Sequence, residues 1–280
     1  MRQLTRRNTL GLAAGAALAG RLPARLLGAA PPAVSPDWRQ LFDGHSLAGW
    51  SVFQQGVGDL DAHRAIRIEN GELHFLGSMF DGPAQATFGH MATVEDFADY
   101  HLRLEYRWGE RRYAPRDLQR RNSGVLYHLA PDRDRLFPDG IEFQVEEGDV
   151  GDAIMINTRA LAGPLLGGTP LWPNYFPGLP TTYEAPIVAG GIARQWFRHA
   201  GPYERLDGWN TLDLYAFGDQ AAHLVNGRIV MTLFAMLDRA GAPLRKGRIA
   251  LEFEAAEVFF RHVALRQLSS AEIERIKAGR

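Results

Sequence analysis

The sequence contains no cysteine among its 280 residues. This absence excludes disulfide bonds, a thiolate nucleophile and zinc sites with cysteine ligands. A phosphate-binding Walker loop, a dinucleotide-binding glycine fingerprint, a Gly-x-Ser-x-Gly nucleophile elbow and a His-Glu-x-x-His zinc motif are missing too. Nucleotide-dependent enzymes, serine hydrolases with that elbow and zincin proteases therefore have no support in the sequence.

The chain also lacks a strong excess of charge of either sign, with 31 Lys+Arg against 32 Asp+Glu. Five of the arginines lie in the first 30 residues, which contain no acid, so the remainder of the chain is mildly acidic. A protein that binds nucleic acid needs a dense cationic surface to neutralise phosphates. We therefore expect no nucleic-acid partner.

No apolar run reaches the roughly 20 residues that a membrane-spanning helix needs. The apolar run after Arg6-Arg7 covers only residues 11–19 and is rich in Ala and Gly. This pattern is typical of a twin-arginine export signal over residues 1–30, with a Pro-rich tether over 31–37; a basic amphipathic helix is the alternative. The first interpretation predicts the twin-arginine export machinery as a partner, a periplasmic or secreted protein and no stable membrane span. Cleavage after Ala19 or near Ala30 would fit.

Alternation of apolar and polar residues predicts an all-β domain over residues 38–280. Asn70-Gly71 and Asn226-Gly227 each separate two alternating runs, which is typical of a β-hairpin. Further alternating runs occupy residues 100–108, 209–217, 247–254 and 258–265. About ten such strands and almost no helical periodicity indicate a two-sheet antiparallel jelly-roll sandwich. Ser269 and Glu272 form a capping-box pattern, which predicts a short C-terminal helix.

The most informative expected strand covers residues 140–146. Glu142, Gln144 and Glu146 share one face of it, and three apolar residues share the other. If the apolar face packs on the core, the polar face lines the open side of the sheet. Two like charges in a cleft raise one pKa and prepare an acid and base pair. A solvated strand face without a role is the alternative.

The stretch from Arg121 to His128 offers a second group of candidates. Tyr127 and His128 are neighbours on an expected strand, so one of them should face the cleft. His128 could act as an acid, a base or a metal ligand, or form a structural hydrogen bond. Asp152 lies just beyond the polar strand and could close a site or cap a turn.

A long segment over residues 158–193 is rich in Gly, Pro and aromatic residues, including Trp172 and Tyr175. A long loop without secondary structure in a compact domain is usually functional. The rings could stack on sugar faces, or they could close the edge of the sandwich. We predict that Trp172 and Tyr175 bind substrate.

Several of these segments together resemble the 3-keto-disaccharide hydrolase family, whose fold is similar to the concanavalin-like lectin and glucanase sandwich. The resemblance spans roughly residues 38–268 and rests on six segments in order: the stretches 41–50, 122–125, 140–144, 209–211, 225–227 and 247–251. Laminarinase-type glucanases carry a similar Glu-x-Asp-x-Glu strand, but the middle position here is Gln144.

The resemblance implies an exported enzyme that cleaves the glycosidic bond of 3-keto-glycosides or 3-keto-disaccharides, by hydrolysis or by removal of the C2 proton and β-elimination. Such a reaction needs a base, an acid for the leaving group and a group that stabilises the enolate. Glu142 or Glu146 would be the base and His128 the acid or a metal ligand. Gln144, Arg121, Tyr127 and Asp152 would bind substrate. Whether Glu and His hold a divalent cation stays open, as does a non-catalytic lectin-like module that binds glycans.

Overall fold

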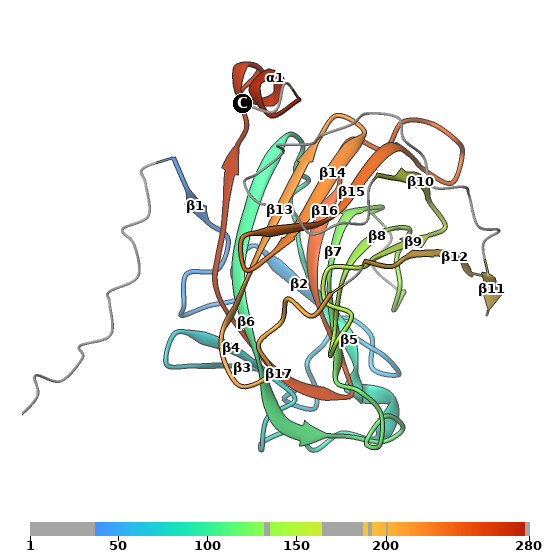
Figure 1. Cartoon of the computed structure of the whole chain (residues 1–280). Helices are drawn as coiled ribbons and strands as arrows, with labels where there is room; N and C mark the ends of the chain where they lie inside the picture. Colours follow the sequence, from blue (N-terminus) through green and yellow to red (C-terminus); the bar gives the residue numbers. More distant parts are fainter. Residues whose placement is uncertain (1–36, 132–134, 164–186, 190–191, 200, 278–280) are drawn as a thin grey trace, which may run out of the picture. The chain divides into compact units, whose positions relative to one another are not determined.

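The computed structural model describes residues 37–131, 135–163, 187–189, 192–199 and 201–277. In this part of the chain every strand pair is antiparallel, and the strands form two sheets (Figure 1). The two-sheet antiparallel sandwich expected from the sequence is therefore confirmed. Where consecutive strands pair through a short connection, they must be antiparallel, since a parallel pair would need a long crossover.

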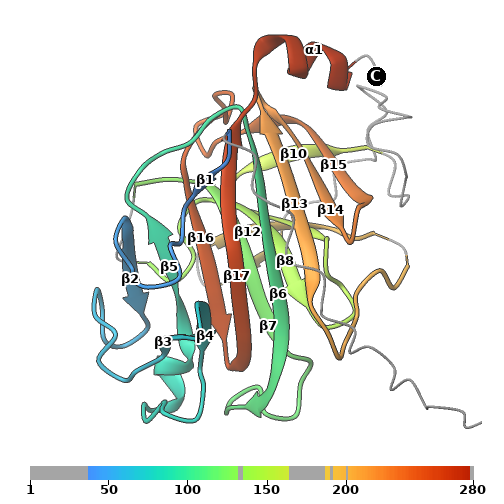
Figure 2. The same cartoon turned by 90° about the vertical axis from the view of Figure 1, so that its left-hand side faces the viewer.

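The first sheet has nine strands within the described residues. In spatial order they are β10 (Arg159–Ala162), β15 (Arg228–Leu237), β14 (Gln220–Val225), β13 (Asn210–Phe217), β6 (Tyr100–Arg112), β17 (Ala256–Gln267), β4 (Glu72–Phe75) and β3 (Ile66–Glu69), and β1 (Arg39–Gln40) pairs with β17. Figure 2 looks onto this sheet, with β6 and β17 running side by side.

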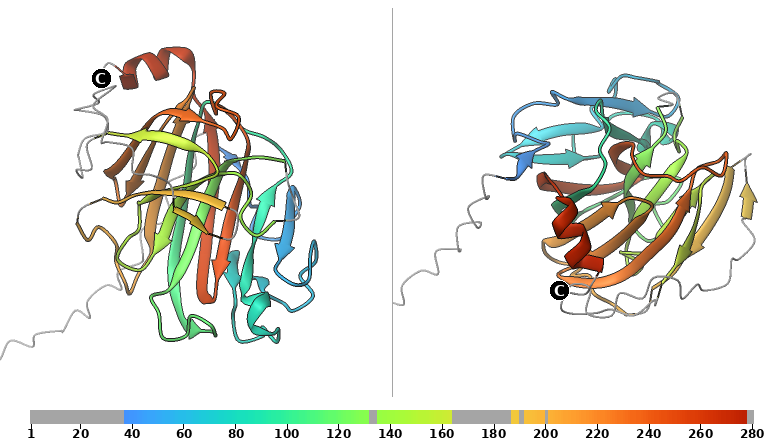
Figure 3. Two further views of the ribbon diagram at one scale, coloured as in Figure 1. Left: turned by 90° about the vertical axis from the view of Figure 1, so that its right-hand side faces the viewer. Right: turned by 90° about the horizontal axis from the view of Figure 1, so that it is seen from above.

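The second sheet has eight strands in the described part of the chain, and it carries the candidate site. Their order is β11 (Ile187–Ala189), β12 (Ile192–Phe197), β9 (Ala153–Ile156), β8 (Gly140–Glu146), β7 (Asn122–Leu129), β16 (Arg248–Glu254), β5 (Phe88–Thr93) and β2 (Trp50–Gln54). A 3₁₀ turn, η1 (Ala84–Thr87), precedes β5. Figure 3 gives two further views of both sheets.

Both expected hairpins form where the sequence places an Asn-Gly pair. Asn70 and Gly71 have φ angles of 54° and 79°, and Asn226 and Gly227 have 50° and 80°. These positive angles at both central residues define a type I′ turn, whose twist matches that of the flanking strands. The pairs therefore fix the registers of β3 with β4 and of β14 with β15.

The hydrophobic core lies between the two sheets. It takes Ile141, Phe143 and Val145 from β8, together with Tyr106 and Phe260 from the opposite sheet. All five side chains are fully buried. Each strand places every second residue in the core, so its other residues face away from it. The face of β8 that the sequence assigned to the core is thus confirmed.

The C-terminal helix α1 (Ser270–Lys277) follows β17 and lies beyond the ends of the strands (Figure 1). Ser269 Oγ accepts a hydrogen bond from the Glu272 backbone N–H, and Glu272 Oε2 accepts one from the Ser269 backbone N–H. These reciprocal bonds are the capping box that the sequence predicts. None of the described helices is long and apolar enough to cross a membrane.

Candidate functional site

A cavity of about 340 Å³ opens on the face of the eight-stranded sheet that points away from the core. We call it the carboxyl cavity. Its lining includes three acids, three amides, two cations and three aromatic rings: Glu142, Glu146, Glu254, Gln55, Asn122, Gln144, Arg116, Arg194, Phe88, Phe137 and Trp196. A concave site with a few convergent polar groups among apolar walls is the usual form of a small-molecule site.

Strand β8 supplies the three polar residues that the sequence singled out. Glu142, Gln144 and Glu146 all line the carboxyl cavity, as their shared face predicts. They are only 5%, 3% and 7% exposed, so they are covered rather than solvated. The structure therefore brings these three residues together in one cavity, and it does not leave them on an open, solvated strand face.

Strand β16 adds two carboxyl groups that the sequence analysis did not identify as site residues. Glu252 and Glu254 alternate with core residues on β16, and Glu254 pairs with Asn122 of β7 while Asn122 pairs with Glu146 of β8. The alternation was visible in residues 247–254. Only the pairing of β16 with β7, across more than 100 residues of chain, makes it part of the site.

Gly124 of β7 lies between the carboxyl groups of Glu142 and Glu252. A Cβ atom built on Gly124 would lie 2.4 Å from Glu252 Oε2 and 2.9 Å from Glu142 Oε1. Because both distances start from the same point, the two oxygens are no farther apart than their sum. Any larger residue here would collide with both carboxyl groups, so glycine is what allows them to meet.

The four acids fall into two pairs with different partners. Arg116 lies 3.0 Å from Glu146 Oε1 and 3.4 Å from Glu254 Oε2, and Arg120 lies 3.0 Å from Glu146 Oε2. No ion pair is formed by Glu142 or Glu252 within the described residues, and Glu252 Oε2 has no hydrogen-bond partner there. Arginines thus neutralise one pair and leave the other uncompensated.

Burial without a partner shifts the ionisation of the uncompensated pair. Desolvation raises the pKa of Glu142 well above its usual value, and the negative charge of Glu254 raises it further, while Arg194 and Arg116 oppose the shift. Desolvation and the neighbouring Glu142 likewise raise the pKa of Glu252. Two buried carboxyl groups this close cannot both ionise readily, so the ionisation of one opposes the ionisation of the other.

Asp152 lies behind the wall of the cavity and does not face it, contrary to the substrate contact expected from the sequence. Its Oδ2 accepts a hydrogen bond of 2.8 Å from Trp196 Nε1, and its Oδ1 accepts bonds from the backbone N–H and Nδ1 of His199. Arg198 stacks on the Trp196 ring at 3.9 Å. Asp152 therefore orients an aromatic wall of the cavity.

The expectation that Tyr127 or His128 faces the cleft is wrong, because both side chains lie in the core. Tyr127 Oη donates a hydrogen bond of 3.0 Å to His223 Nε2, because His223 Nδ1 donates to the Gly151 carbonyl oxygen. His128 packs against Tyr100. Burial lowers the pKa of His128 to about 3, and neither ring nitrogen has a partner in the described residues. A neutral, enclosed imidazole cannot protonate a leaving group in the carboxyl cavity.

A β-bulge explains why the alternation failed at His128. Between Leu126 and Leu129, β7 has one residue more than the opposing segment of β16, and His128 adopts a φ of 51°. An extra residue in one strand shifts the faces of all residues beyond it. Tyr127 and His128 consequently both turn inward, and Leu129 returns to the outer face with Leu126.

Arg121 also differs from its expected role as a substrate ligand. Its Nε donates to Glu147 Oε2 and its Nη1 donates to the Gly109 carbonyl oxygen, both at 3.0 Å, and its guanidinium stacks over Trp108. These contacts hold it outside the lining of the carboxyl cavity. Arg116, five residues earlier in the chain, is the residue that contacts Glu146 and Glu254.

The remaining expectations concern the aromatic loop and a metal ion. Trp172 and Tyr175 lie outside the described residues. In the described segments, no group of three or more His, Asp or Glu side chains is arranged to hold a metal ion. In the carboxyl cavity, Arg116 forms ion pairs with Glu146 and Glu254.

The fold and the site define a β-sandwich with a buried acid cluster on the outer face of one sheet. The 3-keto-alpha-glucoside-1,2-lyase-like domain model matches residues 37–266, and the chain belongs to this family. It is therefore a member of a carbohydrate-active family, as the motif order indicated.

Solved structures similar to this chain include proteins that bind or cleave glycans. A carbohydrate-binding module from Bacillus subtilis has a TM-score of 0.47 and 11% identity, covering 78% of this chain and 96% of its own. A Bacillus licheniformis β-glucanase has a TM-score of 0.43 and 9% identity, covering 83% and 97%. A Bacillus subtilis protein with a galectin-like fold has a TM-score of 0.41 and 11% identity, covering 82% and 94%. No curated protein sequence matches this chain significantly.

Proposed function

We propose that this protein cleaves the glycosidic bond of 3-keto-glycosides by removing the C2 proton and eliminating the C1 substituent. The observation that carries the proposal is the uncompensated carboxyl pair of Glu142 and Glu252 around Gly124. Such a pair holds one proton and one vacant acceptor site. An elimination needs both an acid and a base, and this pair supplies them together.

The chemical steps follow from the 3-ketone, which acidifies the hydrogen on C2. Glu142, as a carboxylate, takes that proton, and the C–H electron pair forms an enolate with the charge on the 3-oxygen. The enolate electrons then form the C1=C2 double bond, the C1–O bond breaks, and the leaving oxygen takes the proton from Glu252. The products are an unsaturated 3-keto sugar and an alcohol; addition of water to the former gives net hydrolysis.

The two roles are assigned from the positions of the two acids. Glu142 lines the carboxyl cavity, whereas Glu252 does not line it and is in register with His90 of β5. Glu142 therefore serves as the base toward the keto sugar in the cavity, and Glu252 keeps the proton and serves as the acid. Arg194 and the amide of Gln144, both in the lining, are the groups placed to stabilise the enolate oxygen.

The test is to offer 3-keto-trehalose and 3-keto-lactose beside trehalose and lactose, and to follow the unsaturated product by ultraviolet absorbance. We expect cleavage of the keto sugars only. Cleavage of both sets at equal rates would contradict the proposal and assign an ordinary glycosidase. Binding without cleavage of either set would assign a lectin-like module instead.

We also propose that the protein is exported by the twin-arginine machinery to the periplasm or beyond. Support comes from Arg6-Arg7 and the weakly apolar run that follows. Replacing both arginines by lysine in the full-length chain should leave the protein in the cytoplasm of the expressing cells. Undiminished export of this variant, measured by fractionation, would contradict the proposal, and export of an Arg21→Lys, Arg25→Lys control should persist.

A further inference from the structure

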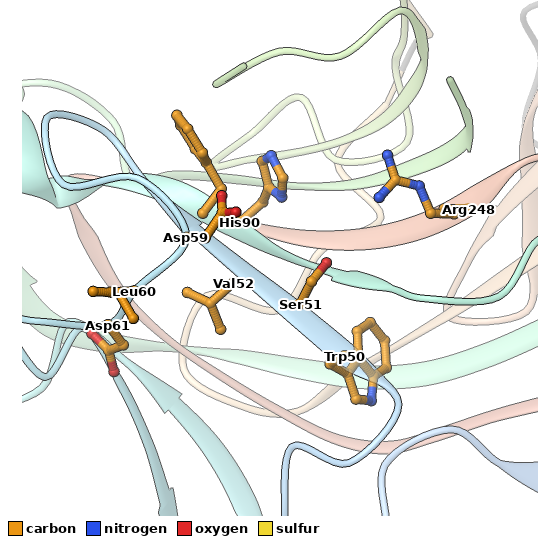
Figure 4. Close-up of a pocket in the computed structure, with 9 residues that line it drawn as sticks. Trp50, Ser51, Val52, Asp59, Leu60, Asp61, His90 and Arg248 are labelled. Atoms are coloured by element: carbon orange, nitrogen blue, oxygen red, sulfur yellow. The ribbon is translucent and has the colours of Figure 1, made fainter. Parts of the chain in front are cut away.

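A second cavity, of about 350 Å³, lies on the same sheet and is not used in the mechanism above. We call it the edge cavity, because β2, the last strand of this sheet, lines it. Figure 4 shows Ser51 of β2 on the same side of the β2 ribbon as His90 of β5 and Arg248 of β16, and Val52 on the other side. Asp59 and Leu60 complete the rim, and both are exposed.

The edge cavity lies directly beside the uncompensated pair of Glu142 and Glu252. His90 of β5 pairs with Glu252 of β16 in the strand register. Neighbouring strands are about 4.8 Å apart, so one strand spacing separates the proposed acid from a residue that lines the edge cavity. Glu252, which lines neither cavity, thus lies between Glu142 of the carboxyl cavity and His90 of the edge cavity.

His90 presents a buried acceptor without a partner. It is 3% exposed, and its Nε2 lies 3.1 Å from the carbonyl oxygen of Arg135, so Nε2 carries the hydrogen and donates. Its Nδ1 is then an acceptor, and it has no partner within the described residues. Burial lowers the pKa of His90 to about 4, so the ring is neutral and Nδ1 is free to accept at neutral pH.

The chemistry of the edge cavity fits a neutral polyol. His90 Nδ1 and the Asp59 carboxylate accept hydrogen bonds, whereas the Arg248 guanidinium donates, so the lining carries both kinds of group. Phe53, stacked on His90 with ring centroids 5.5 Å apart, adds an apolar surface. A sugar has hydroxyl groups that both donate and accept, and its ring has apolar faces.

We propose that the edge cavity binds the leaving sugar of a 3-keto-disaccharide, while the keto sugar occupies the carboxyl cavity. This inference rests on the proposed function for its substrate. It makes the protein an enzyme for disaccharides in which the second sugar contributes to recognition. The glycosidic oxygen then lies at Glu252, between the two cavities.

The first test measures binding and needs no catalysis. Histidine ¹⁵N resonances of the wild-type protein are followed while D-glucose, the leaving sugar of 3-keto-trehalose, is added. The resonance of His90 Nδ1, assigned by its loss in His90→Gln, should shift saturably. An unchanged His90 resonance up to high millimolar glucose would overturn the inference, whatever the catalytic result.

The second test is kinetic and compares 3-keto-trehalose with methyl 3-keto-α-glucoside, which has no second sugar. Ser51→Phe places a ring in the edge cavity, so the ratio of kcat/KM for the disaccharide to that for the methyl glycoside should fall at least about tenfold. Leu206→Phe, at an exposed position outside both cavities, should keep the wild-type ratio.

The outcomes separate the two proposals. If wild-type protein cleaves both substrates and Ser51→Phe keeps their ratio, the edge cavity does not bind the leaving sugar. If wild-type protein cleaves neither substrate, the proposed function fails. The glucose titration of His90 then remains the test of whether the edge cavity binds a sugar.

Discussion

Glu252 and Glu257 are five residues apart in the sequence and both are buried, but their pKa values are shifted in opposite directions. Glu252, on β16, is 1% exposed and has an oxygen without a partner in the described chain. Glu257, on β17, is 3% exposed, and it accepts bonds from His74, Arg111 and two backbone N–H groups. Burial raises the pKa of the first, and hydrogen bonds hold the pKa of the second below its usual value.

The comparison shows that burial alone does not give a carboxyl group its role. Donors around Glu257 replace the water that it lost, so its charge stabilises the junction of β4, β6 and β17. The surroundings of Glu252 supply no such donors, so its neutral form is favoured, as the proposed role of proton donor requires. Five predictions test this distinction, and they follow in decreasing order of expected effect.

Glu252→Gln and Glu142→Gln should each lower kcat on a 3-keto-disaccharide by about 10²–10⁴-fold, because each removes one proton-transfer group. Neither should lower the melting temperature, since glutamine resembles the protonated acid. Steady-state kinetics and thermal unfolding check both statements. Retention of more than a tenth of wild-type kcat by both variants would remove the pair from the mechanism.

Gly124→Ala should lower kcat by roughly 10²-fold, because its methyl group would push the two carboxyl groups apart. The same crowding should destabilise the fold by about 1–3 kcal/mol. Gly208→Ala is the matched control, since nothing lies within 4 Å of a Cβ atom there. Equal kinetics of the two alanine variants would mean that the contact at Gly124 does not matter.

Glu257→Gln should lower the free energy of unfolding by roughly 1–3 kcal/mol at pH 7 and leave kcat near the wild-type value. The pKa of Glu257 is lowered by folding, so its contribution is present above the unfolded-state pKa and is lost as pH falls through the folded-state pKa. The variant's deficit should therefore shrink in acid.

Glu252 should show the opposite pH dependence, since folding raises its pKa. The contribution of Glu252 to the free energy of unfolding is fully present below the unfolded-state pKa, and it is lost as pH rises toward the folded-state pKa. Denaturant unfolding of wild type, Glu252→Gln and Glu257→Gln between pH 4 and pH 8 measures both trends. The measured quantity is the free energy of unfolding of each variant minus that of the wild type. If this difference changed with pH in the same way for both variants, the contrast between these acids would be refuted.

Arg116→Met should shift the acid limb of the kcat/KM pH profile upward, because Arg116 lowers the pKa of Glu142. Arg116→Lys keeps the charge and should restore most of the profile. The pH profile distinguishes this electrostatic role from a structural one, which would change the rate without moving the limb. An unmoved limb in Arg116→Met would show that Glu142 is not the base.

Much of the fold was predictable because local rules determine it. The Asn-Gly turns, the alternation along β8 and the capping box at Ser269 each depend on a few neighbouring residues, and the structure confirms all three. The strand count was underestimated: about ten were expected, and the described residues contain seventeen. The additional strands include two- to four-residue segments such as β1 and β10, which are too short to show alternation.

The candidate site was only half predictable, since pairing across the chain determines the rest. Nothing in residues 121–128 reveals the bulge that turns His128 inward, because it arises from the register of β7 against β16. The same register brings Glu252 to Glu142. The sequence pointed to Asp152 as a sugar ligand, but the positions of Trp196 and His199 give it a different task.

The position of β16 in the sheet also determines how much of the chain is needed to form the uncompensated pair of Glu142 and Glu252. This strand begins at Arg248, near the end of the chain, yet it lies between β7 and β5 in the middle of the sheet. A chain that stops before residue 252 carries Glu142 without its counterpart, and the gap between β7 and β5 stays unfilled. Under the proposed mechanism, a chain truncated before residue 252 would therefore not cleave the 3-keto sugar.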